Sequence, residues 1–285
     1  MLGLIDHGSA GNFHAENNCK KCLDEPYKTY FGLGQSVSLT QAPDVFKVSR
    51  AGIRLGNYLV QSLNPKNLNS SFLDIGTGSG VLALLMRKLG GNDITATDIC
   101  EKSIAQAKIN EHLNFKQPTI SFFVSDLFDG LSEQRFQTIV FNPPGWRTPS
   151  RSLIQRLETR GRTGQLPIRS MFYGDEVISR FLDELPKYLN PTGVAIVGLN
   201  SLVGIRDLLE RYNQKYSNAP PLTYKLIERH TLPLIHYSAH WKALEKHLKL
   251  EFEKWQALDL ATYSTDKNGD IYWSYEIIEF SHHQK

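Results

Sequence analysis

A turn with three glycines follows a short apolar run that holds a single acid. The segment reads Phe72-Leu73-Asp74-Ile75-Gly76-Thr77-Gly78-Ser79-Gly80. Its first four residues suit a buried strand, and the apolar residues from Val81 onward are typical of a helix. A strand that runs through a glycine turn into a helix lets a nucleotide-like ligand approach the backbone closely. The segment therefore predicts a cofactor site.

The kind of cofactor depends on the acid and on the glycine spacing. A dinucleotide-binding fingerprint places glycines at relative positions one, three and six. The sixth position here is Val81, which weakens the NAD interpretation. The carboxylate of Asp74 would repel a pyrophosphate, whereas it can accept hydrogen bonds from an ammonium or from backbone N–H groups. These features favour a cofactor that has a positive group and no phosphate.

Two further acids follow the next two predicted strands. Asp98 ends one strand, where an acid can accept hydrogen bonds from the hydroxyls of a ribose. Asp126 follows the other strand and is placed to meet an adenine amino group. Each acid alone could be a helix cap or a turn residue. Together with Asp74 they lie at the carboxyl ends of successive strands, which is where open α/β sheets bind ligands.

The fourth strand ends in Asn142-Pro143-Pro144. The first proline keeps Asn142 extended, and neither proline has an N–H group. This rigid segment, called the ledge below, offers the Asn142 amide oxygen and the Pro143 carbonyl as paired acceptors for a substrate –NH₂ group. The alternative interpretation is a simple turn that ends a strand.

The elements that must position these residues alternate as a parallel sheet requires. Predicted strands are 72–75, 94–97, 119–124, 138–141, 194–199, 222–228 and 270–280, and predicted helices are 44–63, 81–89, 101–113, 177–189 and 201–215. Another helix, between the last two strands, has one apolar face made of Trp241, Leu244, Leu248, Phe252 and Trp255.

This pattern predicts an α/β fold: a Rossmann-like, seven-stranded, mostly parallel, doubly wound sheet with a helical insertion before the last strand. Residues 1–43 are expected to form a partly irregular N-terminal extension, and residues 44–285 one domain. Within that domain we expect a cofactor half at 44–142, and substrate-side elements at 143–176 and 230–269.

The composition excludes several classes of protein. A net charge of +3 does not by itself indicate nucleic acid, and a hydrophobic fraction of 41% is ordinary for a globular protein. No apolar run is long enough to cross a membrane, and the N-terminus lacks the features of a secretory signal. Three cysteines give no disulfide framework. We expect a cytoplasmic protein, with no membrane and no obligate protein partner.

Taken together, these motifs resemble a class I S-adenosylmethionine-dependent methyltransferase over roughly residues 45–210. The glycine turn and the ledge resemble most the amino-methylating branch, which includes release-factor glutamine methyltransferases and the small methyltransferase domain group. The resemblance implies S-adenosylmethionine as cofactor. It places the methionine part of the cofactor at Asp74, Gly76, Thr77, Gly78 and Gly80, the ribose at Asp98 and the adenine near Asp126. Ile99, Leu127 and Asn142 are further candidates for cofactor binding. The same resemblance gives Asn142, together with Pro143, the role of orienting the nucleophilic nitrogen.

One departure from that branch concerns the substrate. The branch follows its two prolines with an aromatic residue that stacks on the planar target, but this chain has Gly145 and then Trp146. Either Trp146 takes the stacking role, as a catalytic residue beside Asn142 and Pro143, or the substrate is not a flat base or amide. No metal is needed, because the sulfonium is already an activated methyl donor, and the sequence identifies no clear general base.

Arginines are concentrated directly after the ledge. The candidates for substrate binding are Trp146, Arg147, Arg151 and Arg156. They could bind RNA phosphates or an acidic peptide or metabolite. The alternative is a solvated helix whose apolar residues pack inward.

Three residues near the N-terminus, His14, Cys19 and Cys22, could ligate zinc, although their spacing is not a familiar finger pattern and a loose tail is the commoner case. The leading hypothesis is a methyltransferase that acts on an amide or exocyclic-amine nitrogen of an RNA base or a protein side chain. A methyltransferase of a small biosynthetic metabolite is second. An NAD-dependent oxidoreductase or a silent cofactor-binding protein is third.

Overall fold

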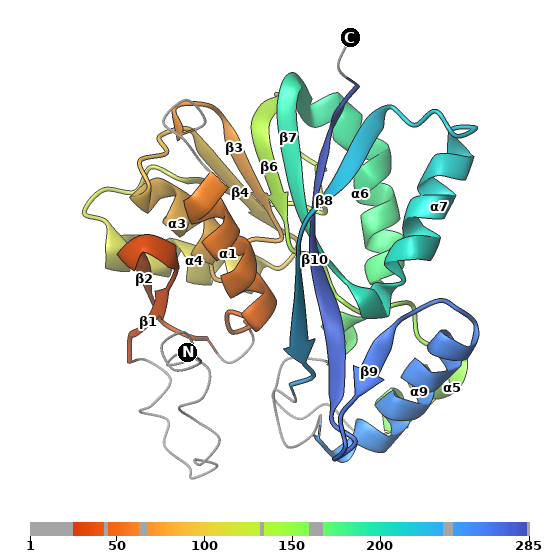
Figure 1. The fold of residues 1–285 in the computed structure, drawn as a ribbon. Helices are drawn as coiled ribbons and strands as arrows, with labels where there is room; N and C mark the ends of the chain where they lie inside the picture. The colour runs from red at the N-terminus through yellow and green to blue at the C-terminus, as the bar shows by residue number, and fades with distance from the viewer. Residues whose placement is uncertain are drawn as a thin grey trace. The chain divides into compact units, whose positions relative to one another are not determined.

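The computed structural model describes residues 25–42, 45–62, 68–131, 134–159, 168–235 and 242–283 (Figure 1). The chain forms two compact units, Met1–Phe141 and Asn142–Lys285. The glycine turn and the three acids belong to the first unit. The ledge begins the second unit, directly after the last strand of the first.

The first unit contains a parallel sheet in the strand order β5-β4-β3-β6. Its strands are β3 (Phe72–Ile75), β4 (Ile94–Asp98), β5 (Ser121–Val124) and β6 (Phe136–Phe141). The helices of this unit are α1 (Arg50–Ser62), α3 (Val81–Lys88) and α4 (Glu101–Asn114). All four residues of β3 are buried, as expected for a central parallel strand, so Asp74 lies in the interior.

An N-terminal hairpin lies within the predicted extension. It consists of β1 (Tyr27–Tyr30) and β2 (Ser36–Leu39), joined through the short helix η2 (Gly32–Gly34). Side-chain amides of α4 bind the β2 backbone: Asn114 Oδ1 accepts from Ser38 N at 2.9 Å, and Asn110 Oδ1 accepts from Thr40 N at 2.8 Å. This part of the extension is therefore more regular than the sequence suggests, because α4 satisfies the backbone of β2.

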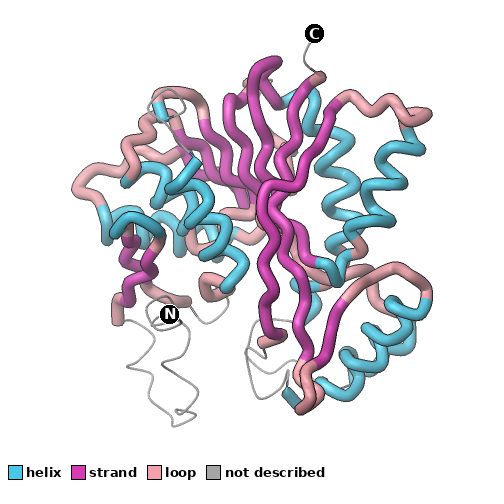
Figure 2. Tube along the Cα trace, viewed as in Figure 1, coloured by secondary structure: helices cyan, strands magenta, loops and turns pink. Residues whose placement is uncertain are grey.

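The second unit contains three long strands, in the order β7-β10-β8, that are prominent in Figure 2. Strands β7 (Leu189–Asn200) and β8 (Leu222–Pro233) both run antiparallel to β10 (Ile271–His282), and the short β9 (Tyr263–Thr265) also pairs with β10. The helices are α5 (Arg151–Thr159), α6 (Gly174–Tyr188), α7 (Ile205–Lys215) and α9 (Glu245–Ala257), with the short turns η3 (Ile168–Met171) and η4 (Ser201–Val203).

The predicted α/β architecture is confirmed, and each of the seven predicted strands has a counterpart. The strand β9 and the N-terminal hairpin are additional. The helical insertion is present as α9, whose Leu248, Phe252 and Trp255 are buried as the apolar stripe predicts. Trp241 lies outside the described residues. Within the described ranges, no helix has both the length and the apolar character that a membrane span needs.

Candidate active site

The glycine turn connects β3 to α3 through residues with left-handed backbone. Gly76 has a φ of 64°, and Gly80, just before α3, has a φ of 83°. A Cβ at Gly80 would also lie 3.0 Å from the Cβ of Ala107 on α4, so this position needs glycine for two reasons. The turn is held to β4 by a hydrogen bond of 2.8 Å from Thr77 N to Thr97 O.

Asp74 organises the turn from the interior. Its side chain is 1% exposed, and Oδ2 accepts hydrogen bonds from Thr77 Oγ1 at 2.6 Å and from Ala83 N at 3.2 Å. Burial raises the pKa of Asp74 to about 7, although these two hydrogen bonds stabilise the ionised form. The carboxylate thus ties the turn to the first residues of α3, and the bond from Ala83 N is of the backbone kind that the sequence suggests for this acid.

Asp98 shapes the same turn from the end of β4. Its Oδ2 accepts from Gly78 N at 2.9 Å, and its Oδ1 accepts from Cys100 N at 2.9 Å. Burial raises the pKa of Asp98, whereas these backbone N–H groups favour its ionised form. Each carboxylate oxygen has a further lone pair, so Asp98 can hold the turn and still accept a hydrogen bond from a ligand hydroxyl.

The predicted neighbours of the two outer acids have different environments. Ile99 is 68% exposed directly after Asp98, which is unusual for an isoleucine and leaves an apolar surface beside the acid. Asp126 is half-buried, and Leu127 is buried with a φ of 54°. The Ser125 hydroxyl donates to the Leu127 carbonyl at 3.1 Å, which holds this turn in shape.

The ledge is fixed by contacts within the second unit. Asn142 Oδ1 accepts a hydrogen bond of 2.9 Å from the hydroxyl of Tyr275 on β10. A Cβ at Gly145 would lie 2.7 Å from Nδ2 of Asn200, and a Cβ at Gly174, the first residue of α6, would collide with the Pro144 carbonyl. The ledge therefore packs closely against both β7 and α6. Tyr275 is the contact that the sequence analysis missed.

Trp146, the candidate for stacking on the substrate, lies in the interior of the second unit. Trp146 is 2% exposed, and its ring makes edge-to-face contacts with Phe172 at 5.1 Å and with Phe252 at 5.4 Å between centroids. Its backbone is also held, because Trp146 N donates to Met171 O at 2.8 Å and Gly174 N donates to Trp146 O at 2.8 Å. The ring belongs to the core of the second unit, where its burial stabilises the fold. It presents no exposed face to a ligand.

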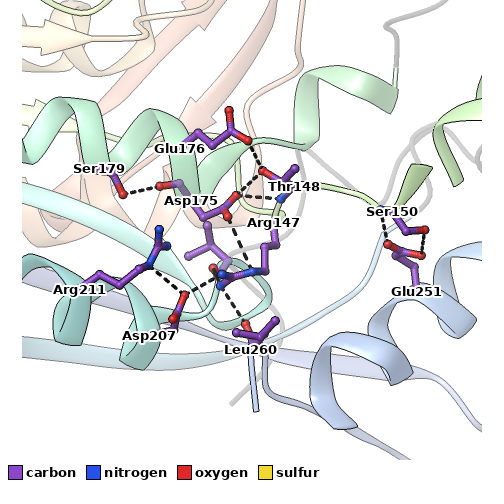
Figure 3. A network of polar contacts seen from close by, with 11 residues as sticks. Arg147, Thr148, Ser150, Asp175, Glu176, Ser179, Asp207, Arg211, Glu251 and Leu260 are labelled. Atoms are coloured by element: carbon purple, nitrogen blue, oxygen red, sulfur yellow. Dashed lines mark hydrogen bonds and ion pairs between the residues drawn. The ribbon is translucent and has the colours of Figure 1, made fainter. Parts of the chain in front are cut away.

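Arg147 is likewise not placed to bind a substrate anion. Its side chain is only 12% exposed, and its guanidinium lies 2.6 Å from Asp207 of α7 and 3.7 Å from Asp175 of α6 (Figure 3). It also donates to the carbonyls of Val203 and Leu260. Two carboxylates and two carbonyls occupy the donors that a phosphate would need, and these contacts favour a structural role for Arg147.

The same network continues along the chain after Arg147. Asp175 Oδ1 accepts from Thr148 N at 2.7 Å and from Thr148 Oγ1 at 2.9 Å (Figure 3). Further on, Glu251 of α9 accepts from Ser150 N at 2.6 Å, immediately before α5. Arg151 and Arg156 both lie on α5 and are exposed, and Arg156 Nη1 is 2.6 Å from His247 Nδ1. These two arginines stay candidates for substrate binding.

The family of the chain follows from comparison with known proteins. The model of the methyltransferase small domain matches residues 36–157, a range that includes the glycine turn and the ledge. A Methanocaldococcus jannaschii protein, provisionally named as a protein N5-glutamine methyltransferase, is 30% identical over 177 residues, which cover 62% of this chain and 83% of that protein. The chain belongs to the methyltransferase small domain family.

Other relatives of this methyltransferase agree with that assignment. The release factor glutamine methyltransferase of Rhodopirellula baltica is 34% identical over 153 residues, covering 50% of this chain and 49% of the relative. Among solved structures, the T. thermophilus 16S rRNA N2 methyltransferase in complex with AdoMet and guanosine has a TM-score of 0.54 at 17% identity, covering 91% of this chain and 50% of that one. A methyltransferase complexed with SAH, SMU.776, also has a TM-score of 0.54, at 12% identity and with coverage of 90% and 56%. At these identities the structures show a shared fold.

The methyltransferase is an S-adenosylmethionine-dependent enzyme, as the sequence predicts. Its first unit fits this cofactor chemically, because acids and an exposed apolar side chain lie beside a glycine turn. A Cβ built on Gly78 would meet no atom of the described chain within 4 Å, so there is open space beside the turn. No group of three or more His, Cys, Asp or Glu residues suited to a metal occurs among the described residues. The zinc candidates His14, Cys19 and Cys22 lie outside them.

Proposed function

We propose that the enzyme transfers the methyl group of S-adenosylmethionine to the carboxamide nitrogen of a glutamine side chain in a protein. The observation that carries this proposal is the ledge: Asn142 is held by Tyr275 and is followed by two prolines and a glycine packed against Asn200. A primary amide has two N–H groups, which match the Asn142 amide oxygen and the Pro143 carbonyl as paired acceptors. The names of the Methanocaldococcus jannaschii and Rhodopirellula baltica relatives support the same acceptor.

The residues after the prolines also favour a carboxamide over a flat base. Gly145 has no side chain, and Trp146 is buried. The first residues after the prolines therefore present no aromatic face on which a nucleobase could stack. A carboxamide is also planar, but its face is much smaller than that of a base, so of these two acceptors it depends less on the missing aromatic residue.

In this proposal the glycine turn and its acids would hold the cofactor, and the ledge would present the acceptor. Asp98 would accept from the ribose hydroxyls, Asp126 would meet the adenine beside the apolar Ile99, and the turn from Gly76 to Gly80 would receive the methionine part. The bound cofactor supplies an activated methyl group on its sulfonium. The protein would hold the acceptor nitrogen with its lone pair directed at that methyl group. Transfer would form the N–CH₃ bond, break the S–CH₃ bond, leave S-adenosylhomocysteine and release one proton from the nitrogen to water.

A second candidate acceptor is the exocyclic amine of an RNA base, which has the same two N–H groups. The exposed Arg151 and Arg156 on α5 favour it, because arginines are suited to phosphate contacts. Both acceptors require the ledge, so the ledge cannot distinguish between them.

The test is transfer of labelled methyl groups to fractionated cell extract. Purified enzyme with tritiated S-adenosylmethionine is given protein, RNA and small-molecule fractions from cells that lack the enzyme, and labelled products are identified by mass spectrometry. We expect label in protein, as N5-methylglutamine. Label in RNA would favour the second candidate, and label confined to small molecules would reject both.

A further inference from the structure

The ledge is held by a buried tyrosine from the far end of the chain. Tyr275 lies in β10 and is 1% exposed, and its hydroxyl is 2.9 Å from Asn142 Oδ1. Burial raises the pKa of the Tyr275 phenol well above its ordinary value, so the hydroxyl keeps its proton and remains a donor. The bond thus joins two side chains that are separated by 133 residues in the sequence.

Strand β7 leaves room for this hydroxyl. A Cβ at Gly198 would collide with the Tyr275 hydroxyl, so the ring can lie over β7 only because that position is glycine. Glycine in the interior of a strand weakens the strand, and it often marks a close approach by another group. Two residues further along β7, Asn200 is paired directly with Tyr275 in the sheet register.

Cross-strand partners in an antiparallel pair lie on the same face of the sheet. Tyr275 and Asn200 are therefore neighbours on one face. Tyr275 bonds to the side chain of Asn142 at the start of the ledge, and Asn200 packs against Gly145 directly after it. One face of the β7–β10 pair thus supports the ledge at its start and just beyond its end.

This contact has a specific chemical consequence for Asn142. A carboxamide attached to a single strand end can rotate about its terminal torsion, which is broad in asparagine. The hydrogen bond from Tyr275 occupies one lone pair of Oδ1 and so fixes the plane of the amide. The second lone pair of Oδ1 then has a defined direction in which it can accept an N–H group.

We propose that Tyr275 is a positioning residue for methyl transfer: its hydroxyl orients the Asn142 carboxamide toward the N–H group of the methyl acceptor. This inference rests on the proposed function, because it assumes that Asn142 accepts from the substrate nitrogen. Tyr275 acts through Asn142 and touches neither the substrate nor the cofactor.

The decisive variant is Tyr275→Phe, which keeps the ring and removes only the hydroxyl. We expect kcat for labelled methyl incorporation to fall about tenfold, since loss of orientation slows reactions without weakening binding. The KM for S-adenosylmethionine and the melting temperature should change little. The matched control is Tyr224→Phe, which removes a tyrosine hydroxyl that accepts from Asn213 Nδ2 at 2.8 Å, away from the ledge.

A double-mutant cycle separates positioning from general packing. If Tyr275 acts through Asn142, Tyr275→Phe should have no further effect on kcat in the Asn142→Ala background. Additive losses, or wild-type kcat in Tyr275→Phe, would overturn the inference while the ledge role of Asn142 stands. An active Asn142→Ala variant would instead overturn the ledge role and the inference together.

A measurement without substrate keeps the inference testable if the acceptor proves to be something else. The side-chain N–H signals of Asn142 can be assigned in ¹⁵N-labelled enzyme by their absence from Asn142→Ala. We expect Tyr275→Phe to shift these signals and Tyr224→Phe to leave them unchanged. Unshifted signals would show that Tyr275 does not orient the carboxamide, whatever the enzyme methylates.

Discussion

The glycine turn and the ledge are both strand-end segments, but they are fixed in different ways. The glycine turn is held by acids that lie close to it in the sequence, Asp74 and Asp98. The ledge is held by residues that come much later in the chain, above all Tyr275, Asn200 and the first residues of α6. Local sequence thus shapes the proposed cofactor site, whereas the tertiary structure of the second unit shapes the proposed acceptor site.

Mutations in the two regions should therefore have different effects. A change in the turn alters the local strand-turn-helix geometry and with it cofactor binding. A change at the ledge is expected to leave cofactor binding intact and to affect only the transfer step. The predictions below test that separation.

The largest effect is expected for Asn142→Ala. Removing a group that contacts the reacting atoms typically lowers turnover by on the order of 100-fold, or about 2.7 kcal/mol. Binding of S-adenosylhomocysteine, measured by calorimetry, should stay near the wild-type value. Asn213→Ala serves as the control, because Asn213 bonds to Tyr224 away from the ledge. Lost cofactor binding in Asn142→Ala would show that the two regions are not separable.

The next effect concerns the stability of the second unit. Arg147→Ala removes the cationic partner of Asp175, whose side chain is 8% exposed, whereas Asp207 keeps its ion pair with Arg211. We expect the free energy of unfolding in urea to fall by about 2 kcal/mol, because the buried carboxylate of Asp175 is left without a cationic partner. Arg206→Ala is the control: Arg206 also pairs with two carboxylates, but its side chain is 71% exposed, and its loss should be hard to detect. An Arg147→Ala variant as stable as wild type would reopen a role in substrate binding.

A third effect should appear in the pH dependence of the glycine turn. Burial raises the pKa of Asp74 to about 7, above its value in the unfolded chain. The unfolded chain therefore loses this proton at lower pH than the folded enzyme does, and the stability contributed by protonated Asp74 is lost as pH rises from about 4 to about 7.

Asp74→Asn removes this titration and keeps the size of the side chain. We measure the free energy of unfolding in urea at each pH. Between about pH 5 and about pH 7, we expect this free energy to rise in the variant by on the order of 1 to 2 kcal/mol relative to wild type. Asp129→Asn, at an exposed position, is the control. A difference between variant and wild type that does not change with pH would contradict the raised pKa.

The contrast between the two regions also explains how far the sequence could predict them. The roles of Asp74, Asp98 and the glycines are encoded within one strand-turn-helix unit and its parallel neighbour, so the pattern alone predicts where they lie. Even the bond from Gly78 to Asp98 follows from the register that pairs Ile75 with Thr97.

The second unit could not be predicted in the same way. Tyr275 reaches Asn142 only because β10 pairs with β7 in a register that the sequence does not specify and because Gly198 leaves room. The burial of Trp146 depends in the same way on Phe172 and Phe252, which come from other segments. Arg147 looked available for a substrate because its partners, Asp175 and Asp207, lie in the first turns of two later helices.

The smallest effect is expected for the exposed arginines of α5, which belong to neither the glycine turn nor the ledge. If the acceptor is a protein carboxamide, replacing Arg151 and Arg156 together with glutamine should change the rate of methyl incorporation less than about twofold, because exposed charges at the surface contribute little to specific positioning. The rate should then depend only weakly on salt. The matched control replaces both residues with lysine, which keeps the charge and removes the forked geometry. A rate that falls steeply with salt in the wild type, and less steeply in the glutamine variant, would indicate phosphate contacts and an RNA acceptor. In that case the acceptor would be recognised mainly by the surface of α5, and the ledge would only orient the nitrogen that this surface brings to it.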